Sequence, residues 1–283
     1  MTAKILNGNA IAEQERLYIA QLVKKRVELG KRRPGLAVVL VGQDPASRLY
    51  VQNKRRACEA VGIYSESYDF SATISVETLL EKIDELNHSP VIDGILVQLP
   101  LPKHIPAEKI LESISVHKDV DGFHSSNMGK IVQNQPGLRP CTPMGIISLL
   151  SYTNIALKGC NACVVGASRI VGRPMALELL NLEATVTMCH RYTQDLPQHI
   201  QRADLVVVAI GQPRFIQGDW IKEDAIVIDV GTTHMPDGKI VGDVDFETAK
   251  LRASWITPVP GGVGPMTVTW LLKNTLIAAE QSL

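Results

Sequence analysis

The chain has 283 residues, of which 45% are hydrophobic and 20% are charged. This length exceeds the size at which a single hydrophobic core keeps growing, so we expect two domains. The 29 Lys and Arg residues balance the 29 Asp and Glu residues, which argues against a protein that binds nucleic acid or an anionic membrane. No window approaches the roughly 18 apolar residues of a membrane span, and the first residues lack the pattern of a signal peptide. We therefore expect a globular, cytoplasmic protein.

Short runs rich in Val and Ile alternate with helical patterns, which is typical of parallel sheets covered on both faces. In the first half, strands are expected over residues 36–42 and 91–102, and helices over residues 11–29, 47–61 and 75–86. Residues 121–143 lose this periodicity and gather Gly, Pro, Ser and Asn. That composition predicts a connection between two domains.

The second half repeats the alternation with spacings that suit βαβ units. Strands are expected over residues 163–166, 185–189, 205–210, 225–230 and 255–256. A final helix over residues 268–279 is expected to pack back on the first domain. The fold class is therefore α/β, with two α/β domains and a cleft between them. We assign residues 1–121 plus 268–283 to the first domain and residues 139–267 to the second.

A glycine-rich turn, in the sequence GASRIVGRP, joins a predicted strand to a predicted helix. Gly166 and Gly172 would let the backbone approach a pyrophosphate, and the N-terminus of the helix would supply N–H donors and a positive dipole end. The glycine spacing differs from the common pattern, and a tight turn without a ligand is the alternative. The strand-to-helix context favours a Rossmann-like second domain that binds a dinucleotide.

The end of the strand over residues 185–189 distinguishes between the two nicotinamide cofactors. An Asp or Glu there would accept hydrogen bonds from the ribose of NAD, but His190 and Arg191 occupy this place. A guanidinium suits a 2′-phosphate because its planar fork donates two charge-assisted hydrogen bonds. NADP is therefore favoured over NAD, the alternative being that Arg191 is a solvated surface charge.

Four polar residues of the first half are candidates for a catalytic site. Tyr50 and Lys54, in YVQNK, are spaced to share one helix face, although such a pair is common in helices of any function. Gln98 is a polar residue at the end of an apolar strand, where open α/β sheets bind ligands. Asp121, in KDVDGF, stands at the expected domain junction, where clefts tend to form.

Five cysteines are an odd number for a disulfide framework. Cys160 and Cys163 form a CxxC, which is found in redox pairs and in zinc sites. No second CxxC or HxxxH follows, and the pair enters an apolar strand whose side chains alternate between two faces. We therefore expect structural cysteines and no metal site.

The segments YVQNK, DGILVQLPLP, KDVDGF, GASRIVGRP and TPVPGGVGPMT occur in the order and at about the spacing of a known family. From its first helix to its last, the chain closely resembles the bifunctional methylenetetrahydrofolate dehydrogenase/methenyltetrahydrofolate cyclohydrolases. The resemblance implies two reactions at one site: hydride transfer from 5,10-methylenetetrahydrofolate to NADP, and hydrolysis of the methenyl product to 10-formyltetrahydrofolate. It also implies tetrahydrofolate derivatives as ligands and a homodimer, with nucleic acid and membrane absent from the expected partners.

The resemblance assigns site residues by motif position. It implies that Lys54 is the principal catalytic residue, that Gln98 interacts with it, and that Tyr50 and Asp121 complete the catalytic set by lining the folate site and binding the pterin. Further folate-binding residues are expected at Val97, Leu99, Pro260, Gly261 and Gly262. Cofactor-binding residues are expected at Thr142, Gly166, Ala167, Ser168, Arg169, Arg191 and Thr232. Ala167 and Thr232 depart from the usual family pattern, and Arg169 is a candidate to compensate for Ala167.

Three other functions stay open from the sequence. The first is a dehydrogenase with little cyclohydrolase activity, because both reactions would share Lys54. The second is a non-catalytic regulator that binds NADP. The third is a redox sensor built on Cys160 and Cys163.

Overall fold

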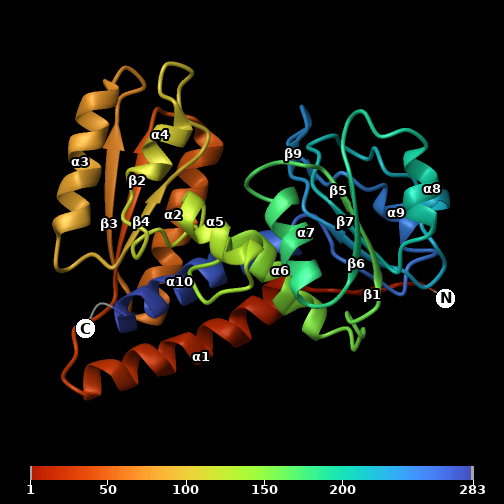
Figure 1. Ribbon diagram of the computed structural model, residues 1–283, viewed down its shortest axis with the longest axis horizontal. Coiled ribbons are helices and arrows are strands. Elements are labelled where there is room, and N and C mark those ends of the chain that lie inside the picture. Colours follow the sequence, from red (N-terminus) through yellow and green to blue (C-terminus); the bar gives the residue numbers. More distant parts are fainter. Residues whose placement is uncertain (1, 282–283) are drawn as a thin grey trace. The chain divides into compact units, whose positions relative to one another are not determined.

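The computed structural model describes residues 2–281; residue 1 and residues 282–283, which the first predicted domain includes, lie outside the described residues. The chain forms two compact units. The three-stranded unit comprises Gln14–Cys141 and the described residues from Val268, and the six-stranded unit comprises the described residues up to Glu13 and Thr142–Thr267. In each unit helices flank a sheet (Figure 1).

The three-stranded unit is built on a parallel sheet in the order β3-β2-β4. Its strands are β2 (Gly35–Val41), β3 (Tyr64–Phe70) and β4 (Gly94–Val97). The central strand, β2, is buried along its whole length, as its unbroken apolar sequence GLAVVLV requires. Val39 and Val41 pack against Leu79 and Ile83 of a flanking helix, so alternate residues of β2 supply one core.

The helices of this unit begin and end at residues suited to those positions. They are α2 (Pro45–Val61), α3 (Val76–His88), α4 (Ala107–Glu112) and α5 (Ser125–Val132). Asp44 caps α2 by accepting a hydrogen bond from the Ser47 backbone N–H, and Gly62 ends it with a φ of +82°. Three more helices have residues in both units: α1 (Gly8–Glu28), α6 (Cys141–Ser151) and α10 (Val263–Gln281).

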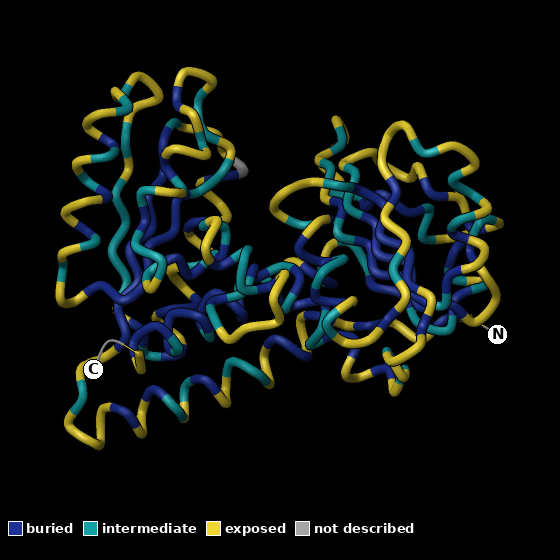
Figure 2. The backbone as a smooth tube through the Cα atoms, viewed as in Figure 1, coloured by how far each residue is buried: buried dark blue, intermediate teal, exposed yellow. Residues whose placement is uncertain are grey.

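The six-stranded unit is built on a parallel sheet in the order β1-β11-β8-β7-β5-β6. Its strands are β1 (Lys4–Ile5), β5 (Asn161–Val165), β6 (Thr185–Cys189), β7 (Leu205–Val208), β8 (Ile226–Asp229) and β11 (Trp255–Ile256). The remaining elements are α7 (Gly172–Asn181), α8 (Leu196–Gln201), η1 (Gly218–Trp220), α9 (Phe246–Ala249) and the hairpin of β9 (Thr233–His234) and β10 (Ile240–Val241). The inner strands β5, β7 and β8 are buried along nearly their whole length (Figure 2). Because successive side chains point to opposite faces, both faces of these strands are covered.

The strand order of the six-stranded sheet fixes where a ligand can bind. The chain leaves β5 for β6 on one side and then returns to β7 on the other side of β5. The connections that follow β5 and β7 therefore lead to strands on opposite sides of this pair. Such a switch point opens the crevice in which open α/β sheets bind their ligands.

The structure corrects three sequence-based expectations. Residues 2–13 belong to the six-stranded unit and not to the first predicted domain, because β1 pairs with β11; a two-residue strand shows no period in the sequence. The predicted connection at residues 121–143 contains α5 and the start of α6, so its Gly and Pro residues form turns between short helices. The strand expected over residues 91–102 is only β4, and β3 was missed because YSESYDF is largely polar.

None of the helices within residues 2–281 is both long and apolar enough to cross a membrane.

The final helix was expected to pack on the first domain. From Val268 onward, α10 belongs to the three-stranded unit.

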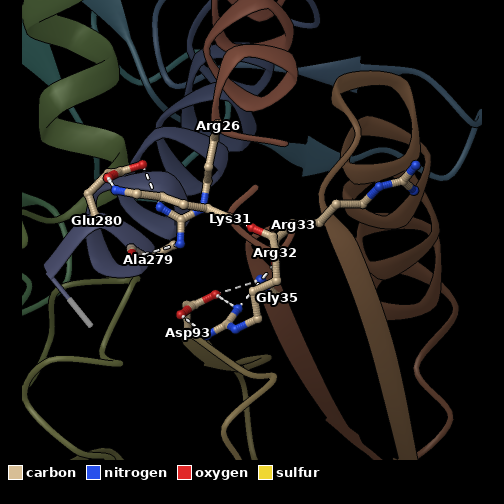
Figure 3. A network of polar contacts seen from close by, with 8 residues as sticks. All are labelled: Arg26, Lys31, Arg32, Arg33, Gly35, Asp93, Ala279 and Glu280. Atoms are coloured by element: carbon tan, nitrogen blue, oxygen red, sulfur yellow. Dashed lines mark hydrogen bonds and ion pairs between the residues drawn. The ribbon is translucent and has the colours of Figure 1, made fainter. Parts of the chain in front are cut away.

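Two carboxylates of the three-stranded unit, those of Asp93 and Glu280, form ion pairs with basic side chains near the start of β2 (Figure 3). Arg26 and Lys31 both contact Glu280, which lies in α10. The Arg32 guanidinium donates to both oxygens of the buried Asp93 carboxylate, at 2.6 and 2.7 Å, and the Gly35 backbone N–H donates to it at 2.8 Å. The Asp93 carboxylate thus fixes the chain where it enters the central strand.

Replacing Asp93 by Ala should lower the free energy of unfolding by about 2 kcal/mol, because a buried bidentate pair and a backbone hydrogen bond are lost while Arg32 can still reach solvent. Urea denaturation at neutral pH measures this change. As a control, Lys24→Ala removes only an exposed ion pair with Glu28 and should change stability by less than about 0.5 kcal/mol. Equal effects of the two substitutions would contradict the assignment.

Candidate active site and cofactor site

Lys54 and Gln98 form the central contact of the candidate catalytic site. Lys54 lies in α2, Gln98 directly follows β4, and the Lys54 Nζ donates a hydrogen bond to the Gln98 Oε1 at 2.9 Å. The Gln98 Nε2 donates to the Leu99 carbonyl oxygen at 2.8 Å, and its backbone N–H donates to the Val39 carbonyl. The amide is therefore held with its oxygen toward the amine. The contact that the resemblance implied between these two residues is present.

Asp121 lies in a loop that is organised by a second buried carboxylate, that of Asp119. The Asp119 oxygens accept hydrogen bonds from the backbone N–H groups of Gly122, Phe123 and His124 at 2.9 to 3.2 Å, and from the Asn127 side-chain amide at 2.9 Å. Burial raises the pKa of Asp119, and these donors oppose that rise. The sequence KDVDGF thus uses its first Asp to fix the loop that presents the second.

The charges of Lys54 and Asp121 influence each other. Desolvation lowers the pKa of the half-buried Lys54 amine, and the Asp121 carboxylate acts in the opposite direction. Desolvation likewise raises the pKa of Asp121, and the charge of Lys54 opposes that rise. Ionised Asp121 thus favours the ammonium, while burial favours the neutral amine. The arrangement makes a lysine that exchanges its proton more readily than a solvated one.

The other residues expected at the folate site differ in exposure. Tyr50 lies one turn before Lys54 in α2 and is 40% exposed. Val97 is buried in β4, so its side chain serves the core of the unit, and Leu99 is half-buried before a cis peptide bond to Pro100.

Cys141 is a neighbour of this site that the sequence analysis did not identify. Its thiol donates to the Val120 carbonyl at 3.2 Å and lies beside the Asp121 carboxylate. Burial holds its pKa well above the usual value, so it is a neutral thiol. Asn274 of α10 donates to the same Val120 carbonyl at 2.8 Å. No sequence pattern marked either residue, because α10 and α6 are far from residue 120 along the chain.

The glycine turn of the six-stranded unit has the close packing of a dinucleotide-binding turn. Gly166 follows β5 with a φ of +119°, and a Cβ at this position would lie 2.2 Å from the Ala209 carbonyl oxygen. A Cβ at Gly172, the first residue of α7, would lie 1.9 Å from the Gly166 carbonyl oxygen. Both positions therefore require glycine, and the turn brings bare backbone to the amino end of α7. These residues suit a dinucleotide phosphate.

Ser168, which was expected to contact the cofactor, also shapes this turn. Its Oγ accepts hydrogen bonds from the backbone N–H groups of Val171 and Gly172, both at 3.2 Å. Ala167 is half-buried, Arg169 is exposed, and both belong to the same turn. Thr142 lies at the start of α6, where its Oγ1 is 3.0 Å from the Thr267 Oγ1.

Arg191 is exposed immediately after β6, and its guanidinium stacks 4.8 Å from the centre of the Tyr192 ring. The backbone of this segment is folded back, because the His190 N–H donates to the Thr193 Oγ1 at 2.9 Å. Thr232 is exposed and directly follows the buried Gly231, in the turn after β8. Turn, arginine and threonine all follow the carboxyl ends of parallel strands, as expected of a cofactor site in this sheet.

The loop of Pro260, Gly261 and Gly262 lies between β11 and α10 in the six-stranded unit. The four candidate catalytic residues lie in the three-stranded unit. Val259 and Pro260 are joined by a cis peptide bond, and Gly261 has a φ of +98°. A Cβ at Gly8 would lie 1.7 Å from the Gly262 carbonyl oxygen, so the start of α1 packs directly on this loop.

Cys160 and Cys163 do not form a pair. Cys160 packs in the core with Met175 and Leu179, whereas Cys163 belongs to the core on the other face of the sheet. The nearest thiol to Cys163 is that of Cys189 in β6, at 3.8 Å between the sulfur atoms. The structural interpretation of the CxxC therefore holds, and a sensor built on these two residues is ruled out by their placement.

A glycine turn at the switch point of a parallel sheet and a desolvated Lys in a second α/β unit define an α/β dehydrogenase with a separate catalytic unit. Family models agree with this class. The tetrahydrofolate dehydrogenase/cyclohydrolase catalytic domain matches residues 6–121, and the NAD(P)-binding domain of the same family matches residues 140–283. The chain belongs to the tetrahydrofolate dehydrogenase/cyclohydrolase family.

Solved structures support the same family. The bifunctional methylenetetrahydrofolate dehydrogenase/cyclohydrolase of Campylobacter jejuni is 46% identical, with a TM-score of 0.97 over 99% of this chain and 100% of that one. The Trypanosoma brucei dehydrogenase-cyclohydrolase, solved with NADP and an inhibitor, is 37% identical, with a TM-score of 0.96 over 100% and 99%. The bifunctional enzyme of Thermoplasma acidophilum is 35% identical, with a TM-score of 0.92 over 99% of both chains. The chain is thus an enzyme, and the alternative of a non-catalytic regulator is wrong.

Replacing Arg191 by Gln should raise the KM for NADP by at least about tenfold and leave the KM for NAD unchanged, because only NADP carries the 2′-phosphate that a guanidinium would bind. Absorbance of the reduced nicotinamide, followed with each cofactor in turn, measures both constants. Arg202→Gln serves as the control, since Arg202 is exposed at the end of α8. A parallel loss with NAD would show that Arg191 does not select the phosphate.

Proposed function

We propose that this chain oxidises 5,10-methylenetetrahydrofolate with NADP and then hydrolyses the methenyl product to 10-formyltetrahydrofolate, with Lys54 as the residue on which both reactions depend. The observation that carries this assignment is the hydrogen bond from the desolvated Lys54 amine to Gln98, with Asp121 beside them. The oxidation needs a hydride acceptor, and NADP bound at the Gly166 turn would be that acceptor. The hydrolysis needs a base that takes a proton from the attacking water.

Lys54 suits the hydrolytic step because its burial increases the fraction of neutral amine. As water attacks the methenyl carbon, the attacking oxygen must lose a proton, and a neutral Lys54 amine can accept it. The proton of the resulting hydroxyl group passes to the ring nitrogen as that nitrogen leaves the carbon, which becomes the formyl group, and the proton held by Lys54 is released to solvent. A cationic substrate next to the amine lowers its pKa further, so the substrate itself favours the form of Lys54 that the reaction needs.

Gln98 can serve both protonation states of Lys54 without adding a charge. Its Oε1 accepts from the ammonium, as in the structure, and an amide that turns over can donate to the free amine. The bond from its Nε2 to the Leu99 carbonyl favours the first arrangement, which stabilises the ammonium that forms when Lys54 accepts a proton.

Asp121 suits the edge of a pterin, which carries adjacent N–H donors. A carboxylate accepts two such hydrogen bonds side by side. The four bonds to Asp119 fix the loop, so Asp121 is presented with little backbone freedom. Tyr50, Val97, Leu99 and the Pro260, Gly261 and Gly262 loop complete the folate-binding residues in this proposal.

For the cofactor, we assign the Gly166 turn with Ala167, Ser168 and Arg169 to the phosphates, Arg191 to the 2′-phosphate, and Thr142 and Thr232 to further contacts. The helix that follows the turn, α7, presents its positive dipole end to the same place.

A cytoplasmic homodimer is also proposed. The supporting observation is that β6 ends the six-stranded sheet with Met188 exposed, which leaves an edge suited to pairing with a second copy.

Replacing Lys54 by Met should reduce both activities by at least about a hundredfold, because the side chain keeps its length but loses the amine. Dehydrogenase turnover is followed by NADPH absorbance, and hydrolysis by the loss of methenyltetrahydrofolate absorbance. Lys109→Met, an exposed lysine of α4, is the matched control. Survival of either activity in the Lys54 variant would remove Lys54 from that step. Methenyl hydrolysis by the native protein at the uncatalysed rate would leave a dehydrogenase alone.

The turnover number for hydrolysis should rise with pH through the pKa of Lys54, below its ordinary value of 10.5, because only the neutral amine accepts the proton from water. Asp121→Asn should move this rise to lower pH, since the carboxylate that favours the ammonium is gone. Turnover at saturating substrate, measured between pH 6 and 10 in both proteins, tests the shift, at roughly half-unit intervals. A rise displaced to higher pH would contradict this coupling.

A further inference from the structure

The loops after β5 and β7 border the switch point of the six-stranded sheet, and these two loops are in contact. The Gly166 turn follows β5, and a Cβ there would lie 2.2 Å from the Ala209 carbonyl and 3.5 Å from the Ile210 side chain. The position of the phosphate turn therefore depends on where the backbone of residues 209–211 lies. That backbone has left the sheet, so β-ladder hydrogen bonds do not hold it beyond Ala209.

Asp243 is the side chain that holds this loop. It lies between β10 and α9 and is 0% exposed. Its Oδ2 accepts hydrogen bonds from the backbone N–H groups of Ile210 at 2.7 Å and Gly211 at 2.9 Å. Two adjacent backbone donors converge on one carboxylate oxygen, which fixes the direction of the chain after β7.

The same carboxylate borders the turn after β8. A Cβ at Gly231 would lie 2.3 Å from the Asp243 Oδ1, so this oxygen packs on the bare Cα of Gly231, one residue before Thr232. Among the described residues, this buried oxygen has no hydrogen-bond partner. The Asp243 Oδ1 therefore acts on the Gly231 turn through its size and its charge. An amide NH2 group in its place would find neither a hydrogen-bond acceptor nor enough space.

Asp229, at the end of β8, holds Asp243 in turn. Its oxygens accept hydrogen bonds from the backbone N–H groups of Asp243 and Val244 at 2.9 Å and of Gly231 at 3.0 Å. Burial raises the pKa of Asp229 to about 7, and these backbone donors oppose that rise. The carboxylates of Asp229 and Asp243 thus tie three loops together at the carboxyl edge of β7 and β8.

We propose that Asp243 is a positioning residue for the cofactor, which holds the Ile210–Gly211 backbone and the Gly231 turn in the arrangement that binds NADP. This inference rests on the proposed function, because it concerns the cofactor of that reaction. Asp243 itself is buried and acts through the loops. A residue that only stabilised the fold would affect both activities alike, whereas Lys54, Gln98 and Asp121 of the hydrolytic reaction belong to the other unit.

The test compares Asp243→Asn and Asp243→Ala with the native protein near pH 8, where Asp229 is ionised. Asn keeps one accepting oxygen but places an amide group against Gly231, and Ala leaves both loop N–H groups without their acceptor. The dissociation constant for NADPH, from a fluorescence titration, should rise about tenfold for Asn and about a hundredfold for Ala. Hydrolysis of methenyltetrahydrofolate, assayed without cofactor, should stay within about twofold.

Asp204→Asn is the matched control. Asp204 is a carboxylate of the same unit that accepts from the Asn161 backbone N–H at 3.0 Å, at the amino end of β5. This variant should bind NADPH as the native protein does. If the Ala variant fails to fold, the Asn variant decides the matter.

Unchanged NADPH binding in Asp243→Asn, or an equal loss of hydrolysis and NADPH binding, would overturn the positioning role. A loss of NADPH binding in Asp204→Asn of the same size would do so too. Failure of the proposed function is seen separately, since the native protein itself would then not reduce NADP in the presence of methylenetetrahydrofolate.

Discussion

The chemistry proposed for this protein depends on an amine that is partly withdrawn from water. Burial of Lys54 disfavours its ammonium form, while Asp121 and the oxygen of Gln98 favour it, so neither form of the amine is strongly preferred. A solvated lysine would stay protonated and could not take a proton from water. A fully buried lysine with no partner would disfavour the ammonium so strongly that it would hold an accepted proton poorly. The segment after β4 supplies Gln98, and the loop fixed by Asp119 supplies Asp121.

Buried carboxylates that accept backbone N–H groups recur throughout the fold. Asp93 fixes the entry into β2, and Asp119 fixes the loop that contains Asp121. Asp229 and Asp243 fix the loops after β7 and β8 in the six-stranded unit. Short parallel strands leave long connections at their ends, and the free N–H groups of these connections need acceptors. A carboxylate can satisfy several at once, so a single side chain sets the path of a whole loop.

The sequence predicts the parts of this protein whose signal is local. Unbroken apolar runs such as GLAVVLV identify buried parallel strands, and a strand followed by GASRIVG predicts the strand–turn–helix unit to which we assign the cofactor. The motifs around Lys54, Gln98 and Asp121 carry a resemblance strong enough to name the family before any geometry is known.

What the sequence could not predict depends on contacts between distant segments. β1 has only two residues and is a strand because β11 lies beside it. The roles of Cys141 and Asn274 follow from the approach of α6 and α10 to residue 120. Asp243 looks like any surface Asp before a short helix, and only its burial against Gly231 distinguishes it. The predicted cleft between the domains stays a prediction.

The pairing of β1 with β11 also has a consequence for how the chain acquires its structure. Lys4 and Ile5 leave the ribosome early, yet their partners, Trp255 and Ile256, are made about 250 residues later. Until then the leading segment has no sheet to join, and its closing contact has a high loop entropy. The outer strand of the six-stranded sheet therefore docks late, onto strands that can already have paired with one another.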